Sequence, residues 1–367
     1  MDECALTERL ITYDTSTEEG IRSAAGFVKG WLEARDVDVR DVLHNGRPVL
    51  AATVGATAGP TVVLHGHLDV VPAPREQFAP RLDGDRLYGR GAYDMKGGLA
   101  AMMCAVRTLA AQSAVRVHFV CVADEESDEQ ARRGSDYLVE EGYRGDFAIT
   151  GEPTDLQIGV QAKGVLAMRV EVAGRSAHGS TPWLGDNAVL KAHGIFHRIE
   201  SMAFSRESSD LFDRPSINLG RIIGGDALNK VPDLCVMDVD VRYLPGQDPE
   251  AILEEVRAIP DTRVSVLFHR APAIVERDNP YVLALAEAVA EGVPADQISV
   301  GRHGASDVVS FLDAGVPAVE FGPVGGGHHG PEEWVSVPSL ERYRTALVDF
   351  VTLIPKTLGA VPRLRIA

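Results

Sequence analysis

Residues 61–72, TVVLHGHLDVVP, change from an apolar run to polar side chains within a few positions. Thr61 to Leu64 is a short, mostly β-branched run, which is typical of a strand buried on both faces of a parallel sheet. His67 and Asp69 follow at its carboxyl end, where open α/β sheets place their ligands. Two residues apart on an extended chain, their side chains point the same way. The pair suits either a metal-bound imidazole with its orienting carboxylate, or a buried histidine that an aspartate satisfies.

Length and composition limit the classes of protein to which the chain can belong. A chain of 367 residues favours two domains, and 45% hydrophobic with 24% charged residues is typical of a globular protein. The net charge of −17 argues against a nucleic acid or an anionic membrane as partner. No secretory leader and no apolar run of about 18 residues is visible, so we expect a cytoplasmic protein.

The cysteines do not predict a reactive or metal-binding thiol site. They are scattered without CxxC spacing, and three lie in apolar surroundings, which favours reduced and buried side chains. The set comprises Cys4, Cys104, Cys121 and Cys235.

Hydrophobic patterns predict an α/β domain with a mixed, mainly parallel sheet flanked by helices. The turn Asn45-Gly46 favours an antiparallel hairpin between the first two strands, and residues 72–85 read as a loop. The expected strands are 37–42, 49–54, 61–64, 115–123, 147–150, 300–304 and 318–321, and the expected helices are 2–13, 19–35, 99–109, 281–292, 307–313 and 340–358.

Residues 163–271 follow a different pattern, because their strands alternate apolar and polar residues as half-exposed antiparallel strands do. We expect strands at 164–173, 216–223, 234–242 and 264–268, with helices at 187–200 and 249–258. This order predicts an inserted α+β sandwich, so residues 1–162 and 272–367 would form the larger domain.

Carboxylates stand where several of the buried elements begin or end. Asp94 precedes a glycine-flexed helix start, where it could also serve as a simple helix cap. Glu125 and Glu126 follow the strand 115–123, and Glu152 follows the strand 147–150. A run of acids is usually a solvated face, but adjacent carboxylates near a low-dielectric interior repel unless they share a cation or a proton.

The segment 322–335, GPVGGGHHGPEEWV, presents His328 and His329 on a glycine-rich loop. Phosphate binding is disfavoured, because no GK[ST] follows and no basic residue helps. One of these histidines is better interpreted as a metal ligand.

Collecting the polar strand ends gives two imidazoles and three carboxylates, which suit a symmetric dinuclear site with one bridging carboxylate. Ligands of this kind without thiolate favour zinc, with cobalt or manganese as alternatives. Two metals can share a water and lower its pKa. The candidate ligands are His67, Asp94, Glu126, Glu152 and a late histidine.

Five motifs in series, HGHLDVVP, GRGAYDMKGG, DEES, TGEP and a terminal HxxEE, resemble a known family over nearly the whole chain. This is the family of dinuclear zinc amidohydrolases and exopeptidases that includes acetylornithine deacetylase, succinyl-diaminopimelate desuccinylase, aminoacylase and glutamate carboxypeptidase. The resemblance implies that His67 and Glu152 bind one metal, that Asp69 orients His67 and that Asp94 bridges both metals, followed by a peptide bond that is often cis.

The same resemblance makes Glu125 the general base and Glu126 a ligand of the other metal. The late family motif is His, two residues, Asn or Asp, then Glu. His329 fits it except that Glu332 occupies the fourth place, whereas His328 would have Pro331 there. We therefore assign His329, and the doubled histidine keeps His328 as an alternative.

In the inserted domain the resemblance implies that His178 reaches a partner subunit's active site and stabilises the oxyanion. Asn229 would lie beside the substrate carbonyl, and Arg242 would bind a substrate carboxylate. The alternatives are a surface-turn histidine for His178 and a structural Arg242–Asp240 pair. The inserted domain is also the family's dimerisation surface, so a homodimer is expected.

The prediction is therefore a metal-dependent hydrolase that cleaves the amide bond of an N-acyl amino acid, with a carboxypeptidase or dipeptidase of the same family as the alternative. The acyl group stays open. Asp128 and Glu129 would favour a basic amino acid, although solvated charge explains them equally well. Ser306-Asp307 matches a family segment that lines the pocket.

Overall fold

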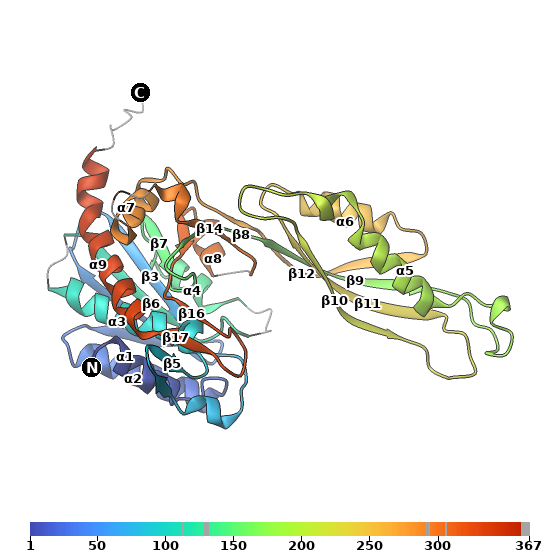
Figure 1. Cartoon of the computed structure of the whole chain (residues 1–367), viewed down its shortest axis with the longest axis horizontal. Coiled ribbons are helices and arrows are strands. Elements are labelled where there is room, and N and C mark those ends of the chain that lie inside the picture. The colour runs from blue at the N-terminus through green and yellow to red at the C-terminus, as the bar shows by residue number, and fades with distance from the viewer. Residues whose placement is uncertain (112–113, 128–131, 291, 293, 305–306, 361–367) are drawn as a thin grey trace. The chain divides into compact units, whose positions relative to one another are not determined.

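The computed structural model describes residues 1–360 except 112–113, 128–131, 291, 293 and 305–306, and it divides into two compact units (Figure 1). The first unit consists of Met1–Val160, Val275–Val300 and Asp307–Ala367. The second consists of Gln161–Ile274 and Gly301–Ser306.

The main sheet is mixed and mainly parallel at its centre, as the sequence predicted. Its strand order is β1-β2-β6-β3-β7-β15-β8-β13, and β14 pairs with β8. β3 is parallel to both β6 and β7, and β15 is parallel to β7, whereas β1, β2 and β6 pair antiparallel. The strands are β1 Val39–His44, β2 Arg47–Gly55, β3 Thr61–His67, β6 Arg116–Val122, β7 Phe147–Thr150, β8 Ile158–Ala162, β13 Ala273–Ile274, β14 Ser299–Arg302 and β15 Ala318–Glu320.

Helices cover both faces of this sheet, which explains why β3 is apolar on both sides. His65 contacts Ser135 of α4 and Phe311 of α8, whereas a Cβ at Gly66 would meet Met95, just before α3, and Leu99 in its first turn. Consecutive residues of β3 therefore face opposite helical layers. The helices are α1 Glu3–Ile11, α2 Glu18–Glu33, α3 Gly97–Ala110, α4 Gly134–Glu140, α7 Pro280–Val289, α8 Val308–Asp313 and α9 Val337–Ala360.

The predicted hairpin is confirmed, because Asn45 and Gly46 both have positive φ between β1 and β2. A small sheet of order β16-β17-β5-β4 was not predicted. It places one strand, β4, within the segment 72–85 that was expected to be a loop, and it pairs Trp334 with Tyr88. Its strands are β4 Arg81–Asp83, β5 Arg86–Tyr88, β16 Gly325–Gly326 and β17 Trp334–Ser336.

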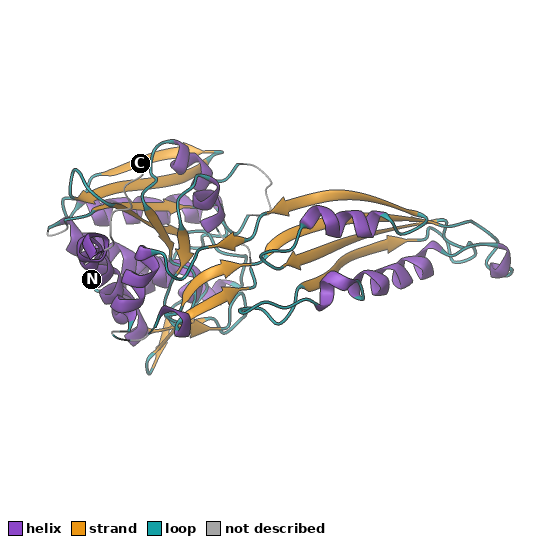
Figure 2. Cartoon of the chain, turned by 90° about the horizontal axis from the view of Figure 1, so that it is seen from above, coloured by secondary structure: helices purple, strands orange, loops and turns teal. Residues whose placement is uncertain are grey.

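The second unit is the predicted strand-helix-strand-strand-helix-strand sandwich. Its sheet has the order β10-β11-β9-β12, and both of its helices pack on one face of that sheet (Figure 2). Alternate residues of β9 and β11 supply the core from below the helices, for example Met168 and Met237. The elements are β9 Gly164–Ala173, α5 Ala188–Glu200, β10 Ser216–Gly224, β11 Leu234–Tyr243, α6 Pro249–Arg257 and β12 Thr262–Arg270.

Short 3-10 helices connect some of these elements, at Arg75–Phe78, Pro182–Leu184, Ala203–Arg206 and Ala295–Gln297. In the part of the chain that the structure describes, no helix combines the length and the hydrophobicity needed to cross a membrane.

Candidate metal centre

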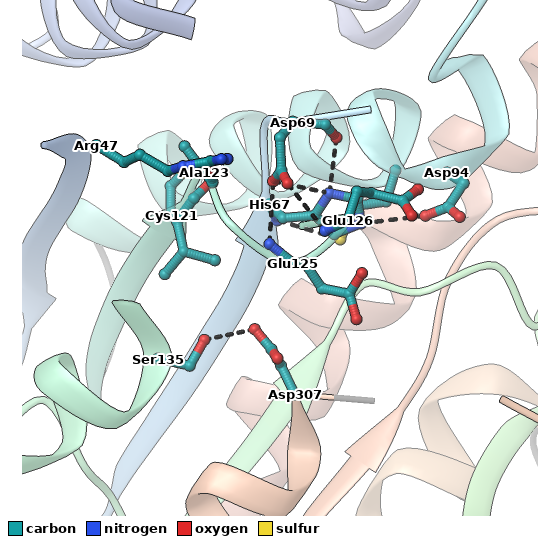
Figure 3. Close-up of polar contacts among 12 residues, drawn as sticks. Arg47, His67, Asp69, Asp94, Cys121, Ala123, Glu125, Glu126, Ser135 and Asp307 are labelled. Atoms are coloured by element: carbon teal, nitrogen blue, oxygen red, sulfur yellow. Dashed lines mark hydrogen bonds and ion pairs between the residues drawn. The ribbon is translucent and has the colours of Figure 1, made fainter. Parts of the chain in front are cut away.

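His67 ends β3, and its two ring nitrogens have different partners. Nδ1 lies 2.9 Å from the main-chain oxygen of Asp69, and Nε2 lies 3.1 Å from Oδ1 of Asp94. A carboxylate oxygen of Asp69 is farther from Nδ1, at 3.6 Å. That carboxylate accepts hydrogen bonds from the main-chain N–H groups of Glu125 and Glu126, at 3.3 and 2.9 Å. Asp69 therefore holds both the imidazole and the loop after β6 (Figure 3).

Asp94 lies at the centre of the cluster, in the segment Ala92–Lys96 that precedes α3. Its side chain is buried, and Oδ2 lies 2.6 Å from Nε2 of His328 and 3.3 Å from Nε2 of His329. The peptide bond from Asp94 to Met95 is cis, as the resemblance implied. Asp94 thus contacts imidazoles that come from β3 and from the glycine-rich loop.

Glu333 fixes the backbone that carries Asp94. Its Oε1 accepts the main-chain N–H groups of Tyr93 and Asp94, at 3.0 and 3.1 Å, and its Oε2 accepts a short hydrogen bond from Arg90. Arg90 also donates to the main-chain oxygen of His329, at 2.9 Å. One buried ion pair therefore ties the Asp94 segment to the histidine loop. The sequence motif contained Glu333, but its partner Arg90 was not predicted as a site residue.

Glu126 and Glu125 occupy the loop after β6 and have different surroundings. Glu126 Oε1 lies 2.9 Å from Nε2 of His329, so these two side chains face the same point as Asp94. The Glu125 carboxylate has no such contact with a histidine among the described residues. Burial, and then the nearby Asp307, raise the pKa of Glu125 to about 8. A carboxyl group with a raised pKa is suited to accept and release a proton near neutral pH.

Glu152 follows β7 and is buried. Its Oε1 lies 3.7 Å from Nε2 of His67 and has no hydrogen-bond partner among the described residues. Burial, and then the neighbouring Asp94, raise its pKa well above the ordinary range. An unpartnered buried carboxylate oxygen is costly unless a cation binds it.

The imidazoles compensate part of this negative charge. Burial opposes the charged forms, but hydrogen bonds with Asp69 and Asp94 raise the pKa of His67 well above its usual value. Similarly, hydrogen bonds from the histidines hold the pKa of Asp94 well below its usual range despite its burial. A cation bound among these groups would compete with their protons, so its binding would release protons.

The donor atoms form two groups that share Asp94. One group is His67, Asp94 and Glu152, and the other is Asp94, His328 and His329, with the atoms of each group within 4.8 Å of one another. Glu126 adds a carboxylate to the second group through its contact with His329. Nitrogen and oxygen donors without thiolate fit zinc or similar divalent cations. The residues present therefore fit metal binding.

Both late histidines reach this site. His328 is closer to Asp94, but only His329 also contacts Glu126 among the described side chains. His329 has a positive φ of 57°, which turns the chain so that adjacent imidazoles converge on one carboxylate.

The residues predicted in the second unit lie in a turn and on a strand. His178 is exposed, its Nδ1 is 2.8 Å from Oγ of Ser180, and its neighbour Gly179 donates to the main-chain oxygen of Asn229. Arg242 lies on β11, and its Nε donates a hydrogen bond to Asp240 at 2.9 Å. The Arg242–Asp240 pair that was the structural alternative for this arginine is therefore present. Three residues named from the sequence lie outside the described residues: Asp128, Glu129 and Ser306.

A model of the peptidase family M20/M25/M40 matches residues 63–353, a range that contains all the candidate ligands. The chain belongs to this family. Membership confirms the resemblance inferred from the motifs and identifies the chain as a hydrolase of a metal-dependent family.

Several family relatives match most of the chain. It is 32% identical over 337 residues to a Mycobacterium tuberculosis protein named as a succinyl-diaminopimelate desuccinylase, which covers 88% of this chain and 90% of that protein. It is 30% identical over 269 residues to the acetylornithine deacetylase of Proteus mirabilis, covering 69% of each. Its fold is similar to that of a Staphylococcus aureus tripeptidase, with a TM-score of 0.79, 22% identity and coverage of 96% and 98%.

Proposed function

We propose that this family member is a dinuclear metal-dependent amidohydrolase that cleaves the amide bond of an N-acyl amino acid. The observation that carries the proposal is the pair of donor groups that share Asp94, with the side chain of Glu125 beside them. We assign His67 and Glu152 to one metal, Glu126 and His329 to the other, and Asp94 to both. Zinc suits these donors best, with cobalt or manganese as alternatives.

Bound cations at these positions supply a Lewis acid that activates water and stabilises a developing oxyanion. Glu125 takes a proton from the attacking water, whose oxygen forms a bond to the amide carbon. Glu125 then gives this proton to the nitrogen as the carbon–nitrogen bond breaks. The Asp69 carboxylate accepts hydrogen bonds from the main-chain N–H groups of Glu125 and Glu126, and these bonds keep Glu125 in place.

The second unit would supply the contacts to the substrate. We assign Asn229 to the carbonyl side of the amide and Arg242 to the substrate carboxylate, which requires Arg242 to exchange Asp240 for the ligand. His178 would stabilise the oxyanion in the active site of a partner subunit.

A homodimer through the second unit is supported by the side chains that this unit exposes. β10 is an edge strand, and Ile223 at its end is 53% exposed, while Leu190 on α5 is 70% exposed. Exposed apolar residues at an edge strand favour pairing with another copy. Light scattering should give twice the mass of 39.4 kDa per particle, and a monomer at micromolar concentration would contradict this assignment.

Mixed dimers test whether the partner subunit's His178 completes the site. E125Q and H178A chains, each inactive alone, would be co-expressed with different tags and the mixed dimer isolated. One of its two sites then combines an intact Glu125 with an intact His178, so activity should return to about half of the wild-type value. No recovery in the mixed dimer would show that His178 does not act across the dimer.

The substrate class is tested with metal-reconstituted protein and a panel of N-acetylornithine, N-succinyl-diaminopimelate, N-acetylmethionine and a plain dipeptide. Metal-dependent hydrolysis of an acylated compound supports the proposal. E125Q should keep both metals and lose about 10²–10⁴-fold in turnover. Near-normal turnover of E125Q would contradict the role of Glu125.

The alternative is an exopeptidase of the carboxypeptidase or dipeptidase type, for which the similar fold of a tripeptidase is the supporting observation. Hydrolysis of the dipeptide without hydrolysis of the acylated compounds would select this alternative.

A further inference from the structure

A cluster of polar residues lies on the side of Glu125 opposite to Asp69, and none of these residues belongs to the candidate ligands. Arg133 stands at the start of α4, Ser135 follows it, and Asp307 precedes α8. Figure 3 shows the Glu125 side chain extending from its loop toward the side on which Asp307 and Ser135 lie. All of these residues belong to the first unit.

Both oxygens of Asp307 have partners inside the protein. Oδ1 lies 3.0 Å from Nη1 of Arg133, and Oδ2 lies 2.5 Å from Oγ of Ser135. Because a carboxylate only accepts, Ser135 donates its single proton to Asp307 and accepts from Nε2 of His65, at 2.8 Å. The Asp307 side chain is fully buried, as are Ser135 and His65. The carboxylate therefore sits in a fixed orientation.

Arg133 connects this fixed carboxylate to Glu125. Its Nη1 contacts the main-chain oxygen of Glu125 at 3.0 Å and the Oε1 atom of Glu125 at 3.4 Å, in addition to Asp307. The contact with the main-chain oxygen holds the loop, whereas the longer contact with Oε1 orients the carboxylate. Because Asp307 balances the charge of Arg133, the guanidinium does not bind Glu125 as its sole counter-ion.

We propose that Arg133 and Asp307 are positioning residues for Glu125: Asp307 holds the Arg133 guanidinium, which in turn holds the Glu125 carboxylate in the orientation needed for proton transfer. The inference rests on the proposed function, in which Glu125 is the general base. It predicts that the effect of Asp307 on turnover passes through Glu125 alone. A structural role for the same cluster would instead affect folding, metal content and turnover independently of Glu125.

The test is a double-mutant cycle between Asp307→Asn and Glu125→Gln in the metal-reconstituted full chain. D307N should lower kcat by about 10–100-fold, with KM changed less than about twofold, because partners of this kind typically have effects of that size. In the E125Q background the same substitution should change kcat by less than about twofold, since no base remains to be positioned. Product would be quantified by mass spectrometry over hours, so that low rates stay measurable.

Metal content provides the second readout. D307N should retain the metal content of the wild type, and the visible spectrum of its cobalt form should match, because the side chains that hold Asp307 here, Arg133 and Ser135, are not assigned ligands. R133K should lose less activity than R133M. Lysine keeps the positive charge and one nitrogen donor, whereas methionine keeps neither. If D307N does not fold, S135A tests the same chain of contacts, since it removes one hydrogen bond from Asp307.

Asp146→Asn is the matched control, because its carboxylate also accepts a hydrogen bond, from the main-chain N–H of Thr61 at the opposite end of β3. D146N should keep normal kcat. The proposal is overturned if D307N has normal kcat, if it lowers kcat equally in the E125Q background, or if its loss follows lost metal. A normal rate for E125Q itself would instead refute the proposed function.

Discussion

Substitution of Glu333 by Gln should destabilise the first unit strongly, although the side chain keeps its shape. The amide oxygen can still accept from the main chain at Tyr93 and Asp94. The amide nitrogen, however, would face Arg90, whose side chain is 3% exposed and would lose its only carboxylate partner among the described residues. Breaking a buried ion pair by removing one partner costs about 3–5 kcal/mol. We expect a loss of that size in the free energy of unfolding.

The neighbouring Glu332 supplies the matched control. Its side chain is 74% exposed and pairs with Arg81 at 3.2 Å on the surface. Exposed pairs contribute at most about 1 kcal/mol, so Glu332→Gln should have little effect. Two substitutions of the same kind, one residue apart, should therefore differ by about 2–4 kcal/mol.

Urea unfolding of the metal-free protein measures this difference without a contribution from bound cations. A Trp183→Phe background leaves Trp31 and Trp334, which both lie in the first unit, as the fluorescent reporters. If E333Q unfolds within about 1 kcal/mol of the wild type, the assigned role of the Arg90–Glu333 pair is wrong.

Three other perturbations have expected outcomes. Gly164→Ala should lower the free energy of unfolding of the second unit by about 1–3 kcal/mol or more, because the added Cβ would lie 2.2 Å from the buried Tyr243 ring. The urea midpoint should fall accordingly, and an unchanged midpoint would contradict this packing. Zinc added to metal-free protein at about 100 times its Kd should raise the free energy of unfolding by about 2.7 kcal/mol per ion, and no shift in the melting curve would argue against the metal centre. Burial and the nearby Arg116 lower the pKa of His118, so below pH 6.5 the unfolded chain binds the proton first and stability falls. His118→Gln should lose less stability between pH 7.5 and pH 5 than the wild type does, and equal losses would exclude this contribution.

The elements that could be predicted from the sequence are those with a clear local signal. The β-branched run at Thr61 gave the central strand, the Asn45-Gly46 turn gave the hairpin, and the two-residue alternation gave the second unit. The polar residues after these strands were also visible, because the carboxyl ends of neighbouring parallel strands meet at one edge.

The features that could not be predicted depend on contacts between distant residues. Arg90 and Glu333 are 243 positions apart, and Arg133 and Asp307 are 174 apart. Arg90, Glu333 and Asp307 stand in segments that the motifs had marked, but nothing in the local sequence says which residue each of them pairs with. The small sheet was missed for a related reason, since β4 and β16 contain too few residues for an alternation to show.

The place where the second unit joins the main sheet has an evolutionary consequence. The chain leaves at the end of β8 and returns in β13, and these strands pair antiparallel with Ala162 opposite Ala273. The two ends of the insertion are therefore neighbours, as they would be on either side of a short hairpin turn. Segments of different length or sequence can be exchanged at such a junction without shifting β3, β6 and β7, the strands at or after whose ends His67, Glu126 and Glu152 stand. If the second unit contacts the substrate as we propose, a change of the insertion alone alters the substrate contacts and leaves the candidate metal ligands in place.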